Sequence, residues 1–268
     1  MRIQSDVGEE RPNNRLRAFP TMGREAMLLL LTFAAGSVDA ISYLGLGHVF
    51  TAMMTGNTVM LGLALGQGHG LAALRSVLAL VGFGAGVAMA AMIVQRGRSQ
   101  GAWPPAVTGA LALEGVLFGV FALTWHLTGT ARGQAVVQAL IVLSGLAMGI
   151  QSAAVQRLGI PGVMTTYITG TMTSLVVGLV GRIRSVDVPS SATGSVGKGV
   201  VPASPPLHRG HRVGLLAAVF LLYGLGALAG GILQARSSSS VALLPLVAVV
   251  VVTVNATIRH QCLGSANS

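Results

Sequence analysis

Hydrophobic residues along the 268-residue chain fall into eight long runs that are separated by shorter polar segments. The runs lie at about 26–46, 51–66, 74–94, 105–125, 134–155, 165–181, 213–234 and 241–258. Most of them lack the polar position every three to four residues that marks the water-facing side of a soluble helix. An apolar helix of about 20 residues is long enough to cross the hydrocarbon core of a bilayer. The pattern therefore predicts an all-α, polytopic transmembrane bundle of six to eight helices.

Two of the runs, 51–66 and 165–181, are short and rich in Thr and Gly. A helix over 51–66 would rise only about 24 Å, which is less than the ~30 Å core of a bilayer. By contrast, Trp103 and Trp125 bracket the fourth run. Their separation corresponds to about 33 Å of helix, which suits two interfacial aromatic positions. The short runs are therefore candidates for re-entrant segments.

An internal repeat links the two halves of the chain. Residues 44–58 align with 158–172 through Leu-Gly, Val, Thr and Thr-Gly in the same order. With a one-residue shift, residues 36–40 upstream match 149–153. Chance similarity between two apolar stretches rich in Thr and Gly is the alternative, and the ordered match favours duplication.

The predicted organisation follows from this repeat and from the composition of the remaining segments. Residues 185–211 are rich in Ser, Gly and Pro, which is typical of a flexible linker. We predict a cytosolic tail over 1–25, a transmembrane domain over 26–258 with repeats at about 26–125 and 134–258, the linker inserted in the second repeat, and a C-terminal tail over 259–268.

Charge constrains the topology without choosing between two arrangements. Eight spans place 13 Lys and Arg residues inside and 4 outside, whereas six spans with two re-entrant segments place 14 inside and 3 outside. Both satisfy the positive-inside rule with a cytosolic N-terminus. Eight spans would make the repeats parallel, and six would make them inverted, a symmetry that recurs in transporters. We favour the inverted form.

Composition and motifs exclude several functional classes. Only 9% of the residues are charged, too few for the surface of a soluble domain, and the excess of 17 basic over 7 acidic residues forms no nucleic-acid-binding motif. The single cysteine, Cys262, has no metal-ligand partner nearby. No catalytic or cofactor-binding motif occurs. We therefore expect no enzyme activity, metal, cofactor or nucleic-acid partner.

Two acidic residues, Asp39 and Glu114, lie inside apolar runs. A carboxyl at mid-membrane costs about 2.5–3.5 kcal/mol even on a lenient scale, so each requires a partner, a proton or water. Asp39 shares a helical stripe with Gly36 and Tyr43, which can face the interior of a bundle. Its alternatives are a titrating or cation-contacting group and a structural hydrogen bond. For Glu114 we expect a helix-packing or hydrogen-bonding role.

Hydroxyl residues recur on one helical face in each Thr-Gly run, and such a face can line a polar path. We expect the two runs to meet near the centre of the bundle about a pseudo-two-fold axis, flanked by Asp39 and Gln151. The alternative is helix packing, because the chain also has Gly-x-x-x-Gly pairs at 62/66, 82/86, 115/119, 145/149 and 226/230. The candidate path residues are Asp39, Tyr43, Thr55, Gly56, Asn57, Thr58, Gln151, Thr169, Gly170 and Thr173.

Several of these motifs, in this order, resemble one family. They are Gly36-Ser37-Val38-Asp39, Thr55-Gly56-Asn57-Thr58, Met148-Gly149-Ile150-Gln151 and Thr169-Gly170-Thr171. The chain is similar to the YoaK family over about residues 25–258. The resemblance implies a multi-pass helical bundle in the bacterial inner membrane and supplies no substrate or mechanism. The N-terminal tail and the 185–211 linker depart from the family pattern.

The leading hypothesis is a permease for a small solute or ion. Its expected partners are the lipid bilayer around it and that unknown solute or ion. The repeat, the short polar segments and the mid-membrane Asp39 together motivate this hypothesis. The alternative is a non-transporting membrane module that binds a protein partner or anionic lipid. The basic region 182–212 would favour the second function, since each basic residue near an anionic leaflet contributes about 1 kcal/mol.

Overall fold

The computed structural model describes residues 22–96, 103–158, 168–186 and 206–264, which form eight helices and no strand. The helices are α1 Arg24–Gly45, α2 Met54–Gly66, α3 Gly70–Arg96, α4 Pro105–Thr128, α5 Gln134–Arg157, α6 Ile168–Val186, α7 Pro206–Arg236 and α8 Leu243–Gly264. Each of the eight apolar runs corresponds to one helix of the described residues, so the predicted all-α polytopic bundle is confirmed. The helices long and apolar enough to cross a membrane are α1, α3, α4, α5, α7 and α8.

Two predicted boundaries are corrected by the ends of α7 and α8. Residues 206–211 were assigned to the linker, but α7 begins at Pro206. Proline suits the first position of a helix because its φ is preset and no N–H is needed there. Residues 259–264 were assigned to the tail, but α8 continues to Gly264, the first glycine after its start. Residues 187–205 of the predicted linker lie outside the described residues.

Helices α1 and α5 form the enclosed centre of the bundle, and they run in opposite directions. The Arg24 guanidinium at the start of α1 donates to the carbonyl of Leu158 just after α5. Seven residues further along α1, the carbonyl of Leu31 accepts from Gln151 Nε2 at 3.2 Å. On α5, Gln151 lies seven residues before Leu158, so the two contacts follow the two helices in opposite directions. This antiparallel register places the start of α1 and the end of α5 on one face of the bundle, called here the first face.

Other contacts assign further helix ends to the first face. The backbone N–H of Met22 donates to Asn255 Oδ1 near the end of α8, at 3.1 Å. Near the start of α4, Thr108 Oγ1 lies 3.3 Å from Nε2 of His260 on α8. Helices α1 and α4 therefore begin where α5 and α8 end.

The opposite ends of these helices form the second face. Gly45 at the end of α1 packs against the indole of Trp125 near the end of α4. The Trp125 Nε1–H donates to the carbonyl of Ser238, between α7 and α8, at 2.6 Å. Arg132 lies over the Trp125 ring with Cζ 3.6 Å from its centroid, and partial burial there lowers the pKa of the guanidinium. Arg75 Nη2, near the start of α3, donates to Gln134 Oε1 at 3.3 Å.

The loop after α1 turns back into the bundle before α2 begins. Gly47 and His48 have positive φ angles of 88° and 62°, and this reversal brings the backbone N–H of Thr51 to Asp39. Asp39 lies six residues before the end of α1, so α2 starts about 9 Å inside that end. Helix α2 has 13 residues, and α3 follows it. Arg75, near the start of α3, lies against Gly47 in the loop after α1, so the start of α3 is back on the second face. Helix α2 thus enters and leaves on the second face, which favours six spans over eight.

Cysteine labelling tests this topology. In a Cys262→Ser background, Gln67→Cys in the α2–α3 turn should react with a membrane-impermeant maleimide from the same side as Ser239→Cys on the second face. Gln156→Cys, near the end of α5, should react from the opposite side. All three positions are exposed in the structure. If Gln67→Cys is labelled together with Gln156→Cys, α2 crosses the membrane and the re-entrant arrangement is wrong.

Helices α1 and α7 approach each other through glycine. A Cβ on Gly36 of α1 would lie 2.0 Å from the carbonyl oxygen of Tyr223 on α7. A Cβ on Gly226 of α7 would lie 2.1 Å from the carbonyl oxygen of Phe33 on α1. Only glycine lets two backbones pack this closely, as small residues do at membrane-helix interfaces.

Helices α3 and α5 repeat this geometry. A Cβ on Gly149 of α5 would lie 2.1 Å from the carbonyl oxygen of Phe83, and one on Gly86 of α3 would lie 2.1 Å from that of Leu146. The three-residue spacings match those in the α1–α7 pair, and Gly149 is the residue that the predicted repeat aligns with Gly36. The duplication stays a prediction, and its inverted form is the one that requires α1 and α5 to run in opposite directions, as they do here.

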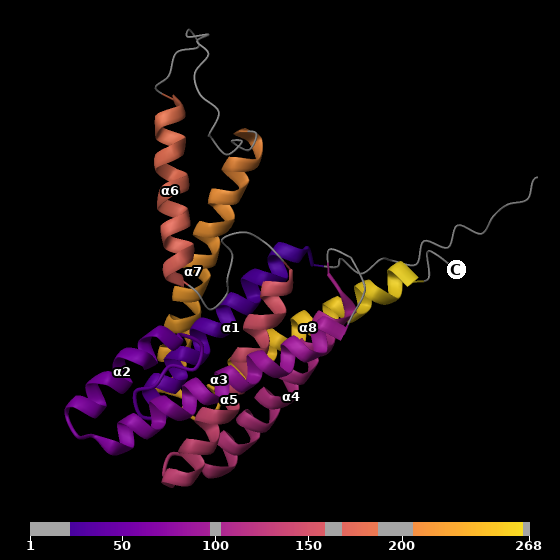
Figure 1. Cartoon of the computed structure of the whole chain (residues 1–268). Coiled ribbons are helices and arrows are strands. Elements are labelled where there is room, and N and C mark those ends of the chain that lie inside the picture. Colours follow the sequence, from indigo (N-terminus) through magenta and orange to yellow (C-terminus); the bar gives the residue numbers. More distant parts are fainter. Residues whose placement is uncertain (1–21, 97–102, 159–167, 187–205, 265–268) are drawn as a thin grey trace, which may run out of the picture.

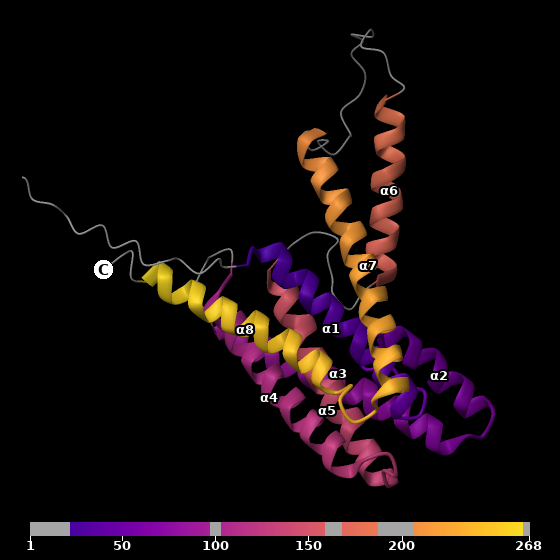
Figure 2. The same cartoon turned by 180° about the vertical axis from the view of Figure 1, so that it is seen from behind.

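Helices α2 and α6 occupy separate positions at the edge of the structure (Figure 1). Helix α2 packs along α3, and α6 packs along α7. The two views agree that α6 and the neighbouring part of α7 extend away from the remaining helices (Figure 2). The exposed side chains of α6 are mostly large and apolar, including Met172, Val177 and Leu179.

Candidate functional site: the polar junction between α1 and α2

Asp39 is buried at the junction between α1, α2 and α7, and both of its carboxyl oxygen atoms have donors. Oδ1 accepts from the backbone N–H groups of Thr51 at 2.8 Å and Ala52 at 2.7 Å, with Met53 more distant at 3.4 Å. Oδ2 accepts from the hydroxyl of Tyr223 on α7. The carboxyl group therefore ties the re-entrant segment to two spanning helices.

Asp39 holds the loop that leads into the N-terminus of α2. The first N–H groups of a helix have no partner within the helix, and the helix dipole makes this end electropositive. The residue before α2, Met53, makes no side-chain cap. Asp39 accepts from the N–H groups of Thr51 and Ala52 in the loop and, at a longer distance, of Met53, the residue just before the helix. A carboxylate at this place is also favoured by the electropositive helix N-terminus. This arrangement offsets part of the cost of burying both the carboxyl and the free N–H groups.

Asn57 holds the other side of the same loop. Its Oδ1 accepts from the backbone N–H of Phe50 at 2.9 Å, and its Nδ2 donates to the carbonyl of Phe50. The hydroxyls of Ser42 and Thr51 lie 2.8 Å apart, which connects the loop to α1. Because Asn57 is fully buried, these paired bonds fix the loop backbone where water is excluded.

Tyr43 and Gly56 enclose the aromatic ring of Phe50. The rings of Tyr43 and Phe50 stack with centroids 5.2 Å apart, while His48 meets Tyr43 edge-on at 4.9 Å. A Cβ on Gly56 would lie 2.9 Å from the Phe50 ring. Four of the predicted path residues, Asp39, Tyr43, Gly56 and Asn57, are therefore brought together at one junction, where they position the loop.

The predicted meeting of the two Thr-Gly runs is wrong for the residues that the structure describes. Helices α2 and α6 do not pack on each other, and Thr55, Thr58, Thr169 and Thr173 are exposed. The expectation was that lipid would force these hydroxyls inward. Instead, Thr58 donates to Met54 O at 3.1 Å and Thr173 donates to Thr169 O at 3.0 Å. A hydroxyl that bonds the carbonyl four residues earlier needs no partner from another helix.

Two further predicted residues lie outside the junction. Gln151 is fully buried, but its amide contacts Leu31 at the crossing of α1 and α5. Leu31 lies eight residues before Asp39, the nearest junction residue on α1. Gly170 lies on α6 beside Thr169. The predicted flanking of one centre by Asp39 and Gln151 is therefore corrected to two separate positions along α1.

Sequence reasoning missed the residue that completes the Asp39 site, and it left two roles open for the other buried acid. Tyr223 is the only tyrosine in its apolar run, which was an available signal for a buried polar contact. For Glu114 on α4 we expected a helix-packing or hydrogen-bonding role, and the described residues give the carboxyl no hydrogen bond. It is fully buried, and neither of its oxygen atoms has a hydrogen-bond partner among the described residues.

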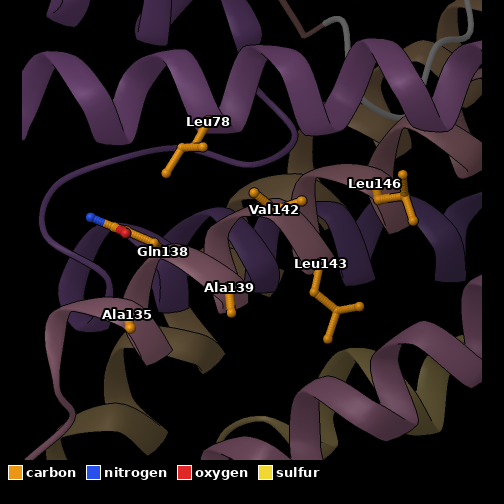
Figure 3. Close-up of a pocket in the computed structure, with 7 residues that line it drawn as sticks. All are labelled: Leu78, Ala135, Gln138, Ala139, Val142, Leu143 and Leu146. Atoms are coloured by element: carbon orange, nitrogen blue, oxygen red, sulfur yellow. The ribbon is translucent and has the colours of Figure 1, made fainter.

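A pocket of about 480 Å³ lies between α3 and α5 near the second face (Figure 3). Gln138 is the only residue with a polar side chain among those that line it, and the lining residues are Leu78, Ala135, Gln138, Ala139, Val142, Leu143 and Leu146. The pocket is separate from the Asp39 junction and offers no polar path. Over the described parts of the chain, no group of three or more His, Cys, Asp or Glu side chains could hold a metal ion.

Comparison with known proteins places the chain in one group. Residues 27–255 match the family described as protein of unknown function DUF1275. The chain is 45% identical over 161 residues to the UPF0700 transmembrane protein YoaK of Bacillus subtilis strain 168, covering 60% of this chain and 69% of that protein. No solved structure matches.

Proposed function

The chain belongs to the DUF1275 family of integral membrane proteins, in which no function is established, and we propose that it is a non-enzymatic permease for a small solute or ion. We further propose that it lies in the bacterial inner membrane with the first face toward the cytosol. In the six-span topology the loops and tails on the first-face side carry 14 of the Lys and Arg residues and those on the second-face side carry 3, so a cytosolic first face follows the positive-inside rule. The second face, with Arg75, Arg132 and Arg236, is then external.

One observation carries the permease proposal: a short helix begins inside a bundle whose central helices are antiparallel. Helix α2 starts beside Asp39, about 9 Å inside the end of α1, and α1 and α5 cross in opposite directions. Inverted halves with short or broken helices near the membrane interior are a recurring transporter design. A polar junction in that position is costly, and a passive structural bundle would not need it.

In this proposal Asp39 controls the junction. Its bonds to Thr51 and Ala52 hold the loop against α1, and its bond to Tyr223 holds α7 at the same point. Release of these bonds would free the start of α2 and open a polar route from the second face. The state described here, with every Asp39 oxygen bonded, is the closed one.

Flux measurements test the proposal. A thermal-shift screen of the purified protein against small solutes first identifies ligands, and flux of the best ligands is then measured in proteoliposomes. Asp39→Asn should abolish or greatly reduce pH-dependent flux while the protein still folds. Thr173→Val changes an exposed hydroxyl of α6 and serves as the control, which should transport normally. Wild-type flux in Asp39→Asn would remove Asp39 from the transport path.

A second function, a non-transporting membrane module, is favoured by one observation. The hydroxyls of Thr58 and Thr173 bond within their own helices and face outward, so they do not line a shared path. In that case the bilayer-facing helices or the basic region 182–212, whose side chains lie outside the described residues, would bind anionic lipid or a protein. Absence of flux for every solute that shifts the melting temperature, together with retention on anionic but not neutral vesicles, would favour this function.

A further inference from the structure

Glu114 lies near the middle of α4. It is 11 residues from Trp103 and 11 residues from Trp125, the two aromatic residues that bracket this helix. At 1.5 Å per residue, the helical interval from Glu114 to Trp125 corresponds to roughly 16 Å, and Trp103 lies two residues before the start of the helix on the other side. Trp103 belongs to the first-face end of α4 and Trp125 packs at the second face. Glu114 is therefore placed near the midplane of the membrane.

The surroundings of Glu114 are apolar. Its side chain is fully buried, as are those of Leu111 and Phe118, which occupy the same face of α4. The adjacent Gly115 faces Val249 of α8. In the described part of the chain, neither carboxyl oxygen of Glu114 receives a hydrogen bond.

The helices packed against α4 bring no charge to the level of Glu114. These helices are α3, α5 and α8, with the end of α1 at Trp125. His260 of α8 contacts Thr108, about 9 Å along α4 from Glu114. Asp39 of α1 is already bonded to its own donors. Apart from Asp39, the titratable or basic residues of these helices, and of α4 besides Glu114, all lie within about six residues of a helix end, as the helix bounds show: Arg24, Glu25, Tyr43, Arg75, Arg96, His126, Arg157, Arg259, His260 and Cys262.

These observations decide between the two states of the carboxyl. An ionised carboxylate without a donor or counter-ion in an apolar interior costs several kcal/mol, whereas a neutral acid costs much less. The contrast with Asp39 is direct, because Asp39 has donors on both oxygens and Glu114 has none. The described structure therefore accommodates Glu114 as the neutral acid.

We propose that Glu114 is a proton-binding site within the membrane, carrying its proton in the state described here. Release of the proton leaves a carboxylate, which requires water, a cation or a new donor to reach the centre of α4. Protonation of Glu114 is thereby linked to the packing of α4 against α5 and α8. This inference stands independently of the permease proposal.

Infrared spectroscopy is the decisive test. The purified protein at neutral pH should show the carbonyl band of a protonated carboxylic acid, shifted in deuterated buffer, and Glu114→Gln should lose that band. Asp39→Asn should keep it, which controls for the other buried acid. Gln is a neutral isostere of the protonated acid, so Glu114→Gln should also keep the wild-type melting temperature. Identical carboxylic-acid bands in wild type and Glu114→Gln would overturn the proposal.

Reaction with dicyclohexylcarbodiimide gives a second readout. A protonated carboxyl adds its O–H across one C=N bond of the reagent, and the resulting O-acylisourea rearranges to a stable N-acylurea with no leaving group. Mass spectrometry should find this adduct on the peptide that contains Glu114, with less adduct as the pH is raised. Adduct that persists in Glu114→Gln or that forms only on Asp39 would contradict the assignment. Neither experiment needs transport, so their results are separable from the flux measurements.

Discussion

Gly226→Ala is expected to lower the apparent melting temperature of the purified protein by roughly 5–10 °C, the result of a clash worth about 3 kcal/mol. The new methyl group would lie 2.1 Å from the carbonyl oxygen of Phe33, and a backbone atom cannot rotate away. Helices α1 and α7 must then separate, which also stretches the bond between Asp39 and Tyr223. Thermal unfolding in detergent, followed by intrinsic fluorescence and by size-exclusion chromatography of heated samples, measures the loss.

Gly224→Ala is the matched control on the same helix. A Cβ on Gly224 meets nothing within 4 Å, and alanine is a better helix former than glycine by about 1 kcal/mol. Its melting temperature should equal or exceed that of the wild type. If Gly226→Ala is tolerated as well as Gly224→Ala, α1 and α7 do not pack at the distance described here.

The same comparison on α3 tests whether the two halves are equivalent. Gly86→Ala would place a methyl group 2.1 Å from the carbonyl of Leu146, whereas a Cβ on Gly84 meets nothing within 4 Å. Under inverted duplication, Gly86→Ala should be as destabilising as Gly226→Ala, and Gly84→Ala should be neutral. A large drop in melting temperature for only one of the two variants would show that the similar glycine contacts do not contribute equally to stability.

The helices were predictable from the sequence because their formation in a membrane depends on local properties. Length and apolar composition are sufficient to place a spanning helix, and backbone groups in lipid must be satisfied within the segment. Helix partners were less predictable. Of the five Gly-x-x-x-Gly pairs, those at 82/86, 145/149 and 226/230 lie at close helix contacts, whereas Gly62, Gly66 and Gly119 face open space. Spacing alone does not say whether another helix is present.

The sequence identified several residues of the site, but the predicted arrangement of these residues was wrong. Asp39 and Asn57 were identified because polar groups in apolar runs are costly, which is a local property. Their partners depend on the reversal at Gly47 and His48, which directs the loop back to Asp39. The four exposed threonines were misassigned because a face of hydroxyls looks the same whether it bonds across helices or to its own backbone.

The α1–α7 and α3–α5 helix pairs share their packing but differ in the polar groups beside it. Tyr223 and Phe83 hold corresponding places, since each presents its carbonyl to the aligned glycines Gly36 and Gly149. Phe83 has no hydroxyl, and Ser152 occupies the position that the repeat aligns with Asp39. The bond between Asp39 of α1 and Tyr223 of α7 therefore has no counterpart between the described parts of α5 and α3. Any opening of the α1–α2 junction would be asymmetric, with its polar control on the second face.

Asp39→Ala is expected to have the largest effect at this junction, a loss of about 3–5 kcal/mol of stability. It would leave the buried N–H groups of Thr51 and Ala52 and the hydroxyl of Tyr223 without their acceptor. Asp39→Asn keeps one oxygen for the loop, and Tyr223→Phe removes one bond only. Each of these two variants should lose about 1–2 kcal/mol.

Hydrogen exchange separates this local role from general destabilisation. At a temperature well below melting, Asp39→Ala should speed amide exchange in a peptide spanning Leu46–Thr58, because the loop loses its anchor while α4 and α5 stay packed. A peptide from α4 around Phe118 serves as the internal control and should exchange as in the wild type. Tyr223→Phe should give a smaller increase in the same loop, since the bonds of Asp39 to Thr51 and Ala52 remain. Unchanged loop exchange in Asp39→Ala would mean that the carboxyl does not hold the start of α2.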